Sequence, residues 1–152
     1  MCTFNETPAF PSTERLLRGR VAVTACPGQD ECGLCAAACG FGALKKPGRM
    51  PAVDFAACIG CAACVKVCPR CNMRLVDGSR DEAQITVKCR LADLPEMDEA
   101  VSIFDENGNE IGRGIAIQAY PLPDGRFGIA RFRTDKALLE RAASAKKQTA
   151  AE

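Results

Sequence analysis

The sequence predicts an α+β fold in which a cysteine-rich module is followed by a small β-rich module and a C-terminal helix. Eleven of the 152 residues are cysteines, and most of them fall in the first half of the chain. The second half alternates short apolar runs with turn residues, a pattern typical of strands joined by hairpins. These observations divide the chain into an N-terminal extension at 1–19, a cysteine-rich domain at 20–89 and a β module with a helix at 90–152.

The amino-acid composition and net charge exclude several classes of function for this chain. The net charge is +1 and the chain has one Tyr and no Trp, so we expect no binding to nucleic acid. Histidine is absent, which removes the commonest general base. The N-terminal residues lack the apolar run of a secretory signal, and no apolar stretch approaches the roughly 18 residues that span a bilayer. We therefore expect a cytoplasmic protein that does not insert into a membrane.

The first elements are short. Residues 1–19 are expected to be a tethered extension with one helical turn near Glu14–Leu17, and Val21–Ala25 is a β-rich run that leads directly into Cys26. Between Cys26 and Cys71 large apolar side chains are few. That segment cannot bury enough apolar surface to offset the entropy of ordering it, so something else must stabilise it.

The clearest motif is CIGCAACVKVCP, in which Cys58, Cys61, Cys64 and Cys68 follow the spacing C-x₂-C-x₂-C-x₃-C-P. Bacterial ferredoxins use this run to hold cubane iron–sulfur clusters, and its fourth cysteine ligates the other cluster of the pair. Because cytosolic thiols stay reduced, cysteines gathered in this way favour metal binding over disulfides. The alternative, a zinc site, would need two C-x-x-C pairs separated by a dozen or more residues.

A stretched copy of the motif precedes this one. It runs C-x₅-C-x₂-C-x₃-C through Cys26, Cys32, Cys35 and Cys39. Turn-forming residues in the wide first gap can bulge outward, so Cys26 can still reach a cluster. In the alternative, Cys26 does not bind, which leaves a three-iron cluster or a solvent ligand at that corner.

Exchange of the fourth ligand between the two copies predicts a two-cluster, bacterial-ferredoxin-like module with two [4Fe–4S] clusters. The predicted ligands of cluster I are Cys26, Cys32, Cys35 and Cys68. The predicted ligands of cluster II are Cys58, Cys61, Cys64 and Cys39. The clusters would replace the missing apolar core, so without iron we expect the chain to be largely unfolded through residue 80.

Three cysteines are left over. Cys71 offers a rival register in which it replaces Cys68, although Pro69 directly after Cys68 favours the standard ligand. Cys2 and Cys89 are expected to be plain thiols, Cys89 buried in a strand. Thiolate-held clusters only exchange electrons, and no base and nucleophile accompany them, so we expect an electron-transfer protein without an active site of its own.

The later elements follow from turn chemistry and apolar patterning. Strands are expected at 74–77, 85–89, 101–104, 112–120 and 126–133. The Asn107-Gly108 step within DENGN is a strong hairpin signal. Residues 135–147 are predicted to form the C-terminal helix, with Asp135 near its start and Leu138 and Leu139 on its apolar face.

Three segments together carry a resemblance to a known family: the stretched first motif, CIGCAACVKVCP, and LPEMDEAVSIFDENGNEIGRG at 94–114. They resemble the small iron–sulfur subunits of multi-subunit flavin-dependent dehydrogenases of the proline or hydroxyproline type. The resemblance covers about 20–134. It departs from the family at Gly40, where the family has Pro, and at Pro69-Arg70-Cys71-Asn72, where the family continues with apolar residues.

The resemblance implies a subunit that relays single electrons between FAD or FMN sites of partner flavoprotein subunits, one of which oxidises an amine or amino-acid C–N bond. It implies the same eight cysteine ligands. The alternative is a free, diffusible ferredoxin with two [4Fe–4S] clusters that serves several oxidoreductases. Free ferredoxins are commonly acidic, so the net charge of +1 favours a fixed subunit.

Overall fold

The computed structural model of the chain describes residues 10–24, 34–45, 51–69, 71, 73–105 and 107–147. The elements of the first half are α1 (Thr13–Leu16), β1 (Val21–Thr24), α2 (Leu34–Ala38), β2 (Leu44–Lys45), β3 (Ala52–Val53), α3 (Ala63–Val67) and β4 (Met73–Asp77). Those of the second half are β5 (Ala83–Arg90), η1 (Leu91–Asp93), β6 (Ala100–Phe104), β7 (Glu110–Pro121), β8 (Phe127–Thr134), η2 (Lys136–Leu138) and β9 (Ser144–Lys147).

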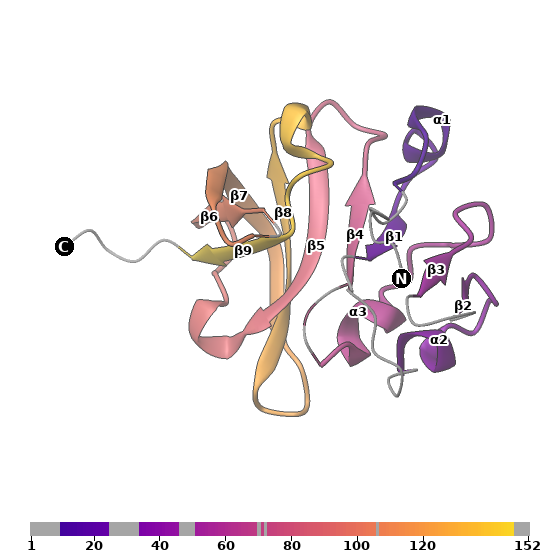
Figure 1. Ribbon diagram of the computed structural model, residues 1–152. Helices are drawn as coiled ribbons and strands as arrows, with labels where there is room; N and C mark the ends of the chain where they lie inside the picture. The colour runs from indigo at the N-terminus through magenta and orange to yellow at the C-terminus, as the bar shows by residue number, and fades with distance from the viewer. Residues whose placement is uncertain are drawn as a thin grey trace.

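The cysteine-rich part consists of two successive β–α–β units, β1–α2–β2 and β3–α3–β4. The outer strands β1 and β4 pair antiparallel, with Val21 opposite Val76, and the inner strands β2 and β3 pair with Leu44 opposite Val53. The two short helices contact each other. Figure 1 shows α2, α3, β2 and β3 gathered at one end of the molecule, away from β6 and β9. This arrangement carries one cysteine motif on each unit.

A single antiparallel sheet joins this part to the second half. Within the described residues its strand order is β1-β4-β5-β8-β7-β6-β9. The predicted division between residues 89 and 90 falls at the end of β5, in the middle of the sheet order, so strands from both sides of the division share backbone hydrogen bonds. All the predicted strands are present, with ends shifted by up to two residues.

The predicted hairpin is confirmed between β6 and β7. Its turn contains Asn107 and Gly108, the latter with a φ of 84° that favours glycine. The Asp105 carboxylate accepts hydrogen bonds from the backbone N–H groups of Asn107 and Asn109 at 2.9 and 3.0 Å. Local turn chemistry therefore explains this connection fully.

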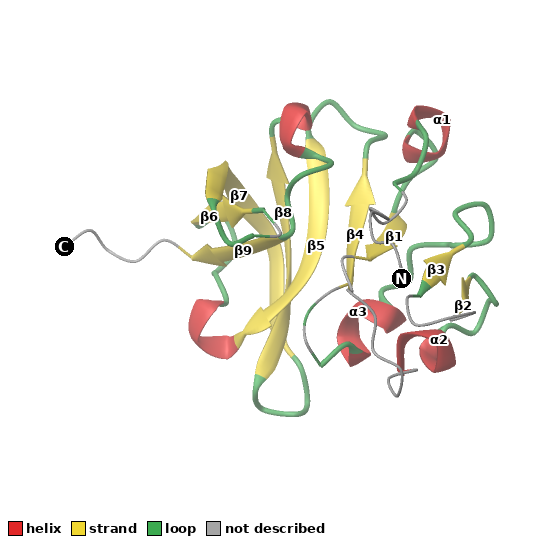
Figure 2. Ribbon diagram, in the orientation of Figure 1, coloured by secondary structure: helices red, strands yellow, loops and turns green. Residues whose placement is uncertain are grey.

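The predicted C-terminal helix over 135–147 is wrong. Asp135 does cap a helical turn, since its carboxylate accepts from the N–H of Ala137 at 2.9 Å, but that turn is the 3₁₀ segment η2. The chain then becomes β9, which pairs antiparallel with β6. The free edge of β6 offers a row of unpaired backbone groups, and β9 satisfies them. Figure 2 shows this final segment as a strand.

The apolar core extends further beneath the cysteines than the sequence suggested. Val65, Met73, Leu75 and Ile129 are buried in one cluster that also contains Cys35, Cys64 and Cys68. A second cluster, centred on Phe132 and Ile85, fills the space under the long strands. Met73, Leu75 and Ile129 lie outside the 26–71 segment, so the strands that flank it supply part of its core. Among the described residues no helix is both long and apolar enough to cross a membrane.

Candidate iron–sulfur centre

One pocket brings together four of the predicted ligands. Cys39, Cys58, Cys61 and Cys64 all line a pocket of about 350 Å³, a volume that includes the part open to solvent. Its other walls are alanines and larger apolar side chains, among them Leu44, Val53 and Leu75. Three of the cysteines come from the second motif and Cys39 comes from the first. These are the four residues predicted for cluster II.

The loop that carries the second motif is tightly wound. Gly60 and Ala62 both have a φ of 75°, in the left-handed region, and Ala62 directly precedes α3. Such residues occur in backbone nests, whose N–H groups turn toward an anion. Cys64 then lies buried in the first turn of α3, whereas Cys61 is exposed. The loop thus brings three cysteines from one short stretch of sequence to the lining of the pocket.

Backbone N–H groups surround the sulfur of Cys39. Burial by itself raises the pKa of this thiol, but hydrogen bonds from the N–H groups of Phe41, Ala43, Leu44 and Gly42 outweigh it and lower the pKa below the ordinary thiol value. Gly42 turns the chain with a φ of 69°. The thiolate is the form that binds metal, so this turn favours the ligand form of Cys39.

A second hydrogen bond of this kind reaches Cys58. The backbone N–H of Ala22, in β1, donates to the sulfur of Cys58 at 3.3 Å. Hydrogen bonds to ligand sulfurs are one of the terms that set the reduction potential of an iron–sulfur cluster. The first strand of the fold is therefore coupled directly to the second motif, 36 residues later in the chain.

Cys64 is buried and lies within electrostatic range of four other thiols. Burial, followed by the charges of Cys58, Cys35, Cys61 and Cys39, raises its pKa to about 12. Several thiolates at one place repel each other unless cations lie between them, which is the condition that bound iron provides. All eight described cysteines are free thiols.

The four thiols that line the pocket can be compared with the ligand set of a cubane cluster. Among the described residues no three His, Cys, Asp or Glu side chains converge closely enough to hold one metal ion. A cubane carries its irons at separate corners, so its thiolates surround a volume and do not meet at one point. Four thiols around an apolar pocket, with N–H donors to their sulfurs, are suited to a [4Fe–4S] cluster.

The predicted site of cluster I is described only in part. Cys35 in α2 and Cys68 after α3 are both buried and belong to the same apolar cluster. Cys26 and Cys32 lie outside the described residues, as does Cys2, and their roles stay predictions. Cys68 and Cys35 are thus brought into one part of the core by the two β–α–β units.

Cys71 differs from Cys68 in its surroundings. It is half-buried with a φ of 59°, and its N–H donates to the carbonyl oxygen of Cys68 at 3.3 Å. It is not a member of the apolar cluster that holds Cys35 and Cys68. Burial raises its pKa, against the opposing charges of Lys88 and Arg90. Cys89 is buried in β5, as predicted, and burial raises its pKa to about 12.

Two buried cations beside the cysteine motifs were not predicted. Arg15, in the segment taken as a tethered extension, and Lys88, in β5, are 7 and 6 % exposed. Arg15 donates a hydrogen bond to the backbone carbonyl oxygen of Cys58, and Lys88 donates one to that of Cys68. No sequence motif marks such contacts, because the acceptors are backbone atoms more than 15 residues away.

A family model described as 4Fe-4S binding domain matches residues 51–70, the segment that contains Cys58, Cys61, Cys64 and Cys68. No curated protein and no solved structure matches the chain. A 4Fe–4S binding domain is therefore present, and it indicates a ferredoxin-like, iron–sulfur electron-transfer role. It points to an electron carrier and not to a catalytic centre.

Proposed function

We propose that this chain, with its 4Fe–4S binding domain at residues 51–70, carries two [4Fe–4S] clusters and relays single electrons as the iron–sulfur subunit of a flavin-dependent amine or amino-acid dehydrogenase complex. The observation that carries the two-cluster reading is the pocket in which Cys39, from the first motif, joins Cys58, Cys61 and Cys64. Because Cys39 would complete the ligand set of this pocket, Cys68 of the second motif is left for the other cluster, which is the exchange known from two-cluster ferredoxins.

Each cluster, when bound, would take up and release one electron. The residues of the chain hold it and set its surroundings. Cys39, Cys58, Cys61 and Cys64 would ligate cluster II, and Cys26, Cys32, Cys35 and Cys68 would ligate cluster I. N–H donors to the sulfurs of Cys39 and Cys58 would stabilise negative charge, and the apolar walls would limit access of water.

The surface at the pocket supports a partner subunit. Phe41 and Ile59 line the pocket, yet 55 and 58 % of these side chains is exposed. Large apolar side chains that stay exposed together mark a protein interaction site. An electron has to pass between redox centres that lie close together, so the rim of cluster II is where a flavoprotein would dock. The family resemblance over 20–134 supplies the flavoprotein as the partner.

The experiment is anaerobic purification of the tagged chain from its native host. We expect a flavin-containing protein to co-elute at a fixed ratio, with about eight iron per chain. Ile59→Asp should release that partner, with iron measured in the same fraction because Ile59 also lines the pocket, whereas Met97→Asp, which changes a side chain that is 65 % exposed in the segment between η1 and β6, should leave both partner and iron unchanged. A monomer with full iron and no flavoprotein would instead identify a diffusible ferredoxin.

A further inference from the structure

The segment before β1 places a buried guanidinium against the loop of the second cysteine motif. Arg15 donates from Nη2 to the carbonyl oxygens of Cys58 at 2.8 Å and Arg20 at 3.0 Å. Its Nη1 donates to the carbonyl oxygen of Gly19 at 3.1 Å, and its Nε donates to that of Phe55. One side chain thus ties residues 55–58 to residues 19–20, across about 40 positions of sequence.

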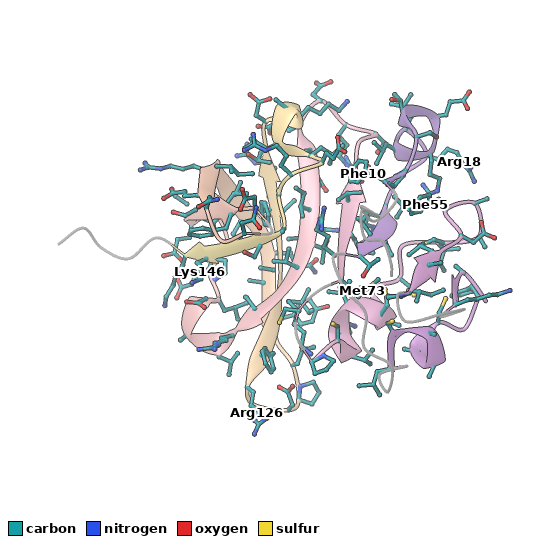
Figure 3. The ribbon with its side chains drawn as sticks, in the orientation of Figure 1. Phe10, Arg18, Phe55, Met73, Arg126 and Lys146 are labelled. Atoms are coloured by element: carbon teal, nitrogen blue, oxygen red, sulfur yellow. The ribbon has the colours of Figure 1, made fainter. Side chains whose placement is uncertain are left out.

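The loop and the strand entry are in close contact at this point. The α-carbon of Gly60 faces Arg20 so closely that a Cβ there would lie 2.8 Å from the Arg20 carbonyl oxygen. α1 itself is fixed by Ser12, whose hydroxyl accepts from the N–H of Arg15 at 3.2 Å. Figure 3 shows Arg18 and Phe55 on the side of the molecule that carries α1. Arg15 therefore links the entry to β1 with the loop that carries Cys58.

The charge of Arg15 is not neutralised by its hydrogen bonds. All its acceptors named above are uncharged carbonyl oxygens, and a buried cation is costly unless negative charge lies nearby. Burial lowers the pKa of Arg15, while the Cys58 thiolate, and more weakly Asp77, raise it against the opposing charge of Arg18. An anionic cluster held by Cys58 would supply the missing counter-charge.

We propose that Arg15 is a positioning residue for cluster II, which anchors the Cys58 loop and raises the reduction potential of the cluster through its positive charge. The inference rests on the proposed function, because it requires a cluster at Cys58. Reduction adds one negative charge to the cluster. A fixed cation nearby stabilises the reduced form, and removing that cation shifts the potential in the negative direction.

The test compares Arg15→Gln and Arg15→Lys with Arg18→Gln, which removes an exposed cation three residues away. The readouts are iron per chain and the midpoint potentials of the two clusters in an anaerobic titration followed by electron paramagnetic resonance. At the wild-type midpoint, Arg15→Gln should lower the reduced-to-oxidised ratio of one cluster by roughly tenfold, about 59 mV for a one-electron couple. Arg18→Gln, screened by solvent, should change it far less.

Arg15→Lys separates the effect of the positive charge from the effect of the hydrogen bonds that the guanidinium makes. It keeps the positive charge but cannot span four carbonyl groups, so the potential should stay near wild type while the cluster is lost more easily on heating. Full iron and unchanged potentials in Arg15→Gln would overturn the inference. If Arg15→Gln loses iron, retention of iron and potential in Arg15→Lys supports the role of the charge, and an equal loss of iron in Arg18→Gln overturns the inference. A wild-type chain without iron–sulfur clusters would instead overturn the proposed function.

Lys88 makes similar contacts at the fourth cysteine of the same motif, which is predicted to ligate the other cluster. Its ammonium donates to the carbonyl oxygens of Lys66 at 2.8 Å and Cys68 at 2.9 Å, and lies 4.7 Å from the centre of the Phe127 ring. Cys68 is a predicted ligand of cluster I. Lys88→Met should therefore shift the potential of the cluster that Arg15→Gln leaves unchanged. A shift of the same cluster by both variants would contradict the assignment of Arg15 to cluster II.

Discussion

Gly60, between Cys58 and Cys61, should not tolerate even a methyl group. Its φ is 75°, and a Cβ would lie 2.6 Å from the Cβ and 2.8 Å from the carbonyl oxygen of Arg20. Gly125 provides a matched control, because its φ is 74° but a Cβ there would meet no atom within 4 Å. The pair of substitutions Gly60→Ala and Gly125→Ala therefore shares a backbone cost and differs only in crowding.

The expected loss of stability follows from the cost of the backbone conformation and the cost of the crowding. The left-handed conformation costs an alanine about 1–2 kcal/mol at either position. Overpacking adds about 1–3 kcal/mol at Gly60 alone, because the backbone of Arg20 cannot rotate away. Gly60→Ala should thus lower the free energy of unfolding by about 2–5 kcal/mol, and Gly125→Ala should lower it by about 1–2 kcal/mol. Relief of the crowding moves the loop that carries Cys58 and Cys61, so Gly60→Ala should also lose iron.

The assay is anaerobic thermal unfolding combined with iron and sulfide determination on the purified variants. For a chain of this size, 1 kcal/mol corresponds to about 2–4 °C in the unfolding midpoint. Gly125→Ala should keep the iron content of the wild type with a modestly lower midpoint. Equal effects of the two substitutions on midpoint and iron would refute the reasoning, because crowding against Arg20 would then have no consequence.

Two further predictions concern single cysteines. Cys39→Ala should remove about one cluster's worth of iron, whereas Cys71→Ala should leave iron unchanged; the reverse result would reassign the ligands. The pKa of Cys89 is about 12 in the fold against an ordinary value of 9.0, so the unfolded chain loses this proton first as pH rises. Stability should therefore fall from about pH 9 upward, and Cys89→Ala should flatten that fall in unfolding curves recorded between pH 8 and 11. An identical pH slope in both proteins would count against this burial.

Much of the sheet could be predicted because its signals are local. The Asn107-Gly108 turn and the apolar runs around it are contained in one short stretch, and the hairpin of β6 and β7 follows from them. The last strand could not be predicted in this way. Leu139, Ala142 and Ala145 are buried at intervals of three residues, a spacing that also suits a helix. What decides for a strand is the free edge of β6, which lies 40 residues earlier in the chain.

In the candidate site, too, local sequence signals predict some features, whereas features that depend on distant contacts could not be predicted. Cysteine spacing predicts the tight loops, and the known exchange between paired motifs predicts that Cys39 lies with Cys58, Cys61 and Cys64, as it does in the pocket. Their role as ligands stays a prediction. Arg15 could not be found, because its acceptors are backbone carbonyl groups that carry no side-chain signature, and those of Phe55 and Cys58 are about 40 residues away. Two prolines, Pro8 and Pro11, and no more than one expected helical turn made its segment look like an extension.

The count of iron and acid-labile sulfide in the anaerobically purified chain tests the central claim most directly. Two [4Fe–4S] clusters require about eight of each per chain, and full reduction should give the spectrum of two magnetically interacting centres. About four iron with a single isolated signal would contradict the two-cluster account and restrict the cluster to residues 51–70 and Cys39. Zinc in place of iron would contradict the electron-transfer role altogether.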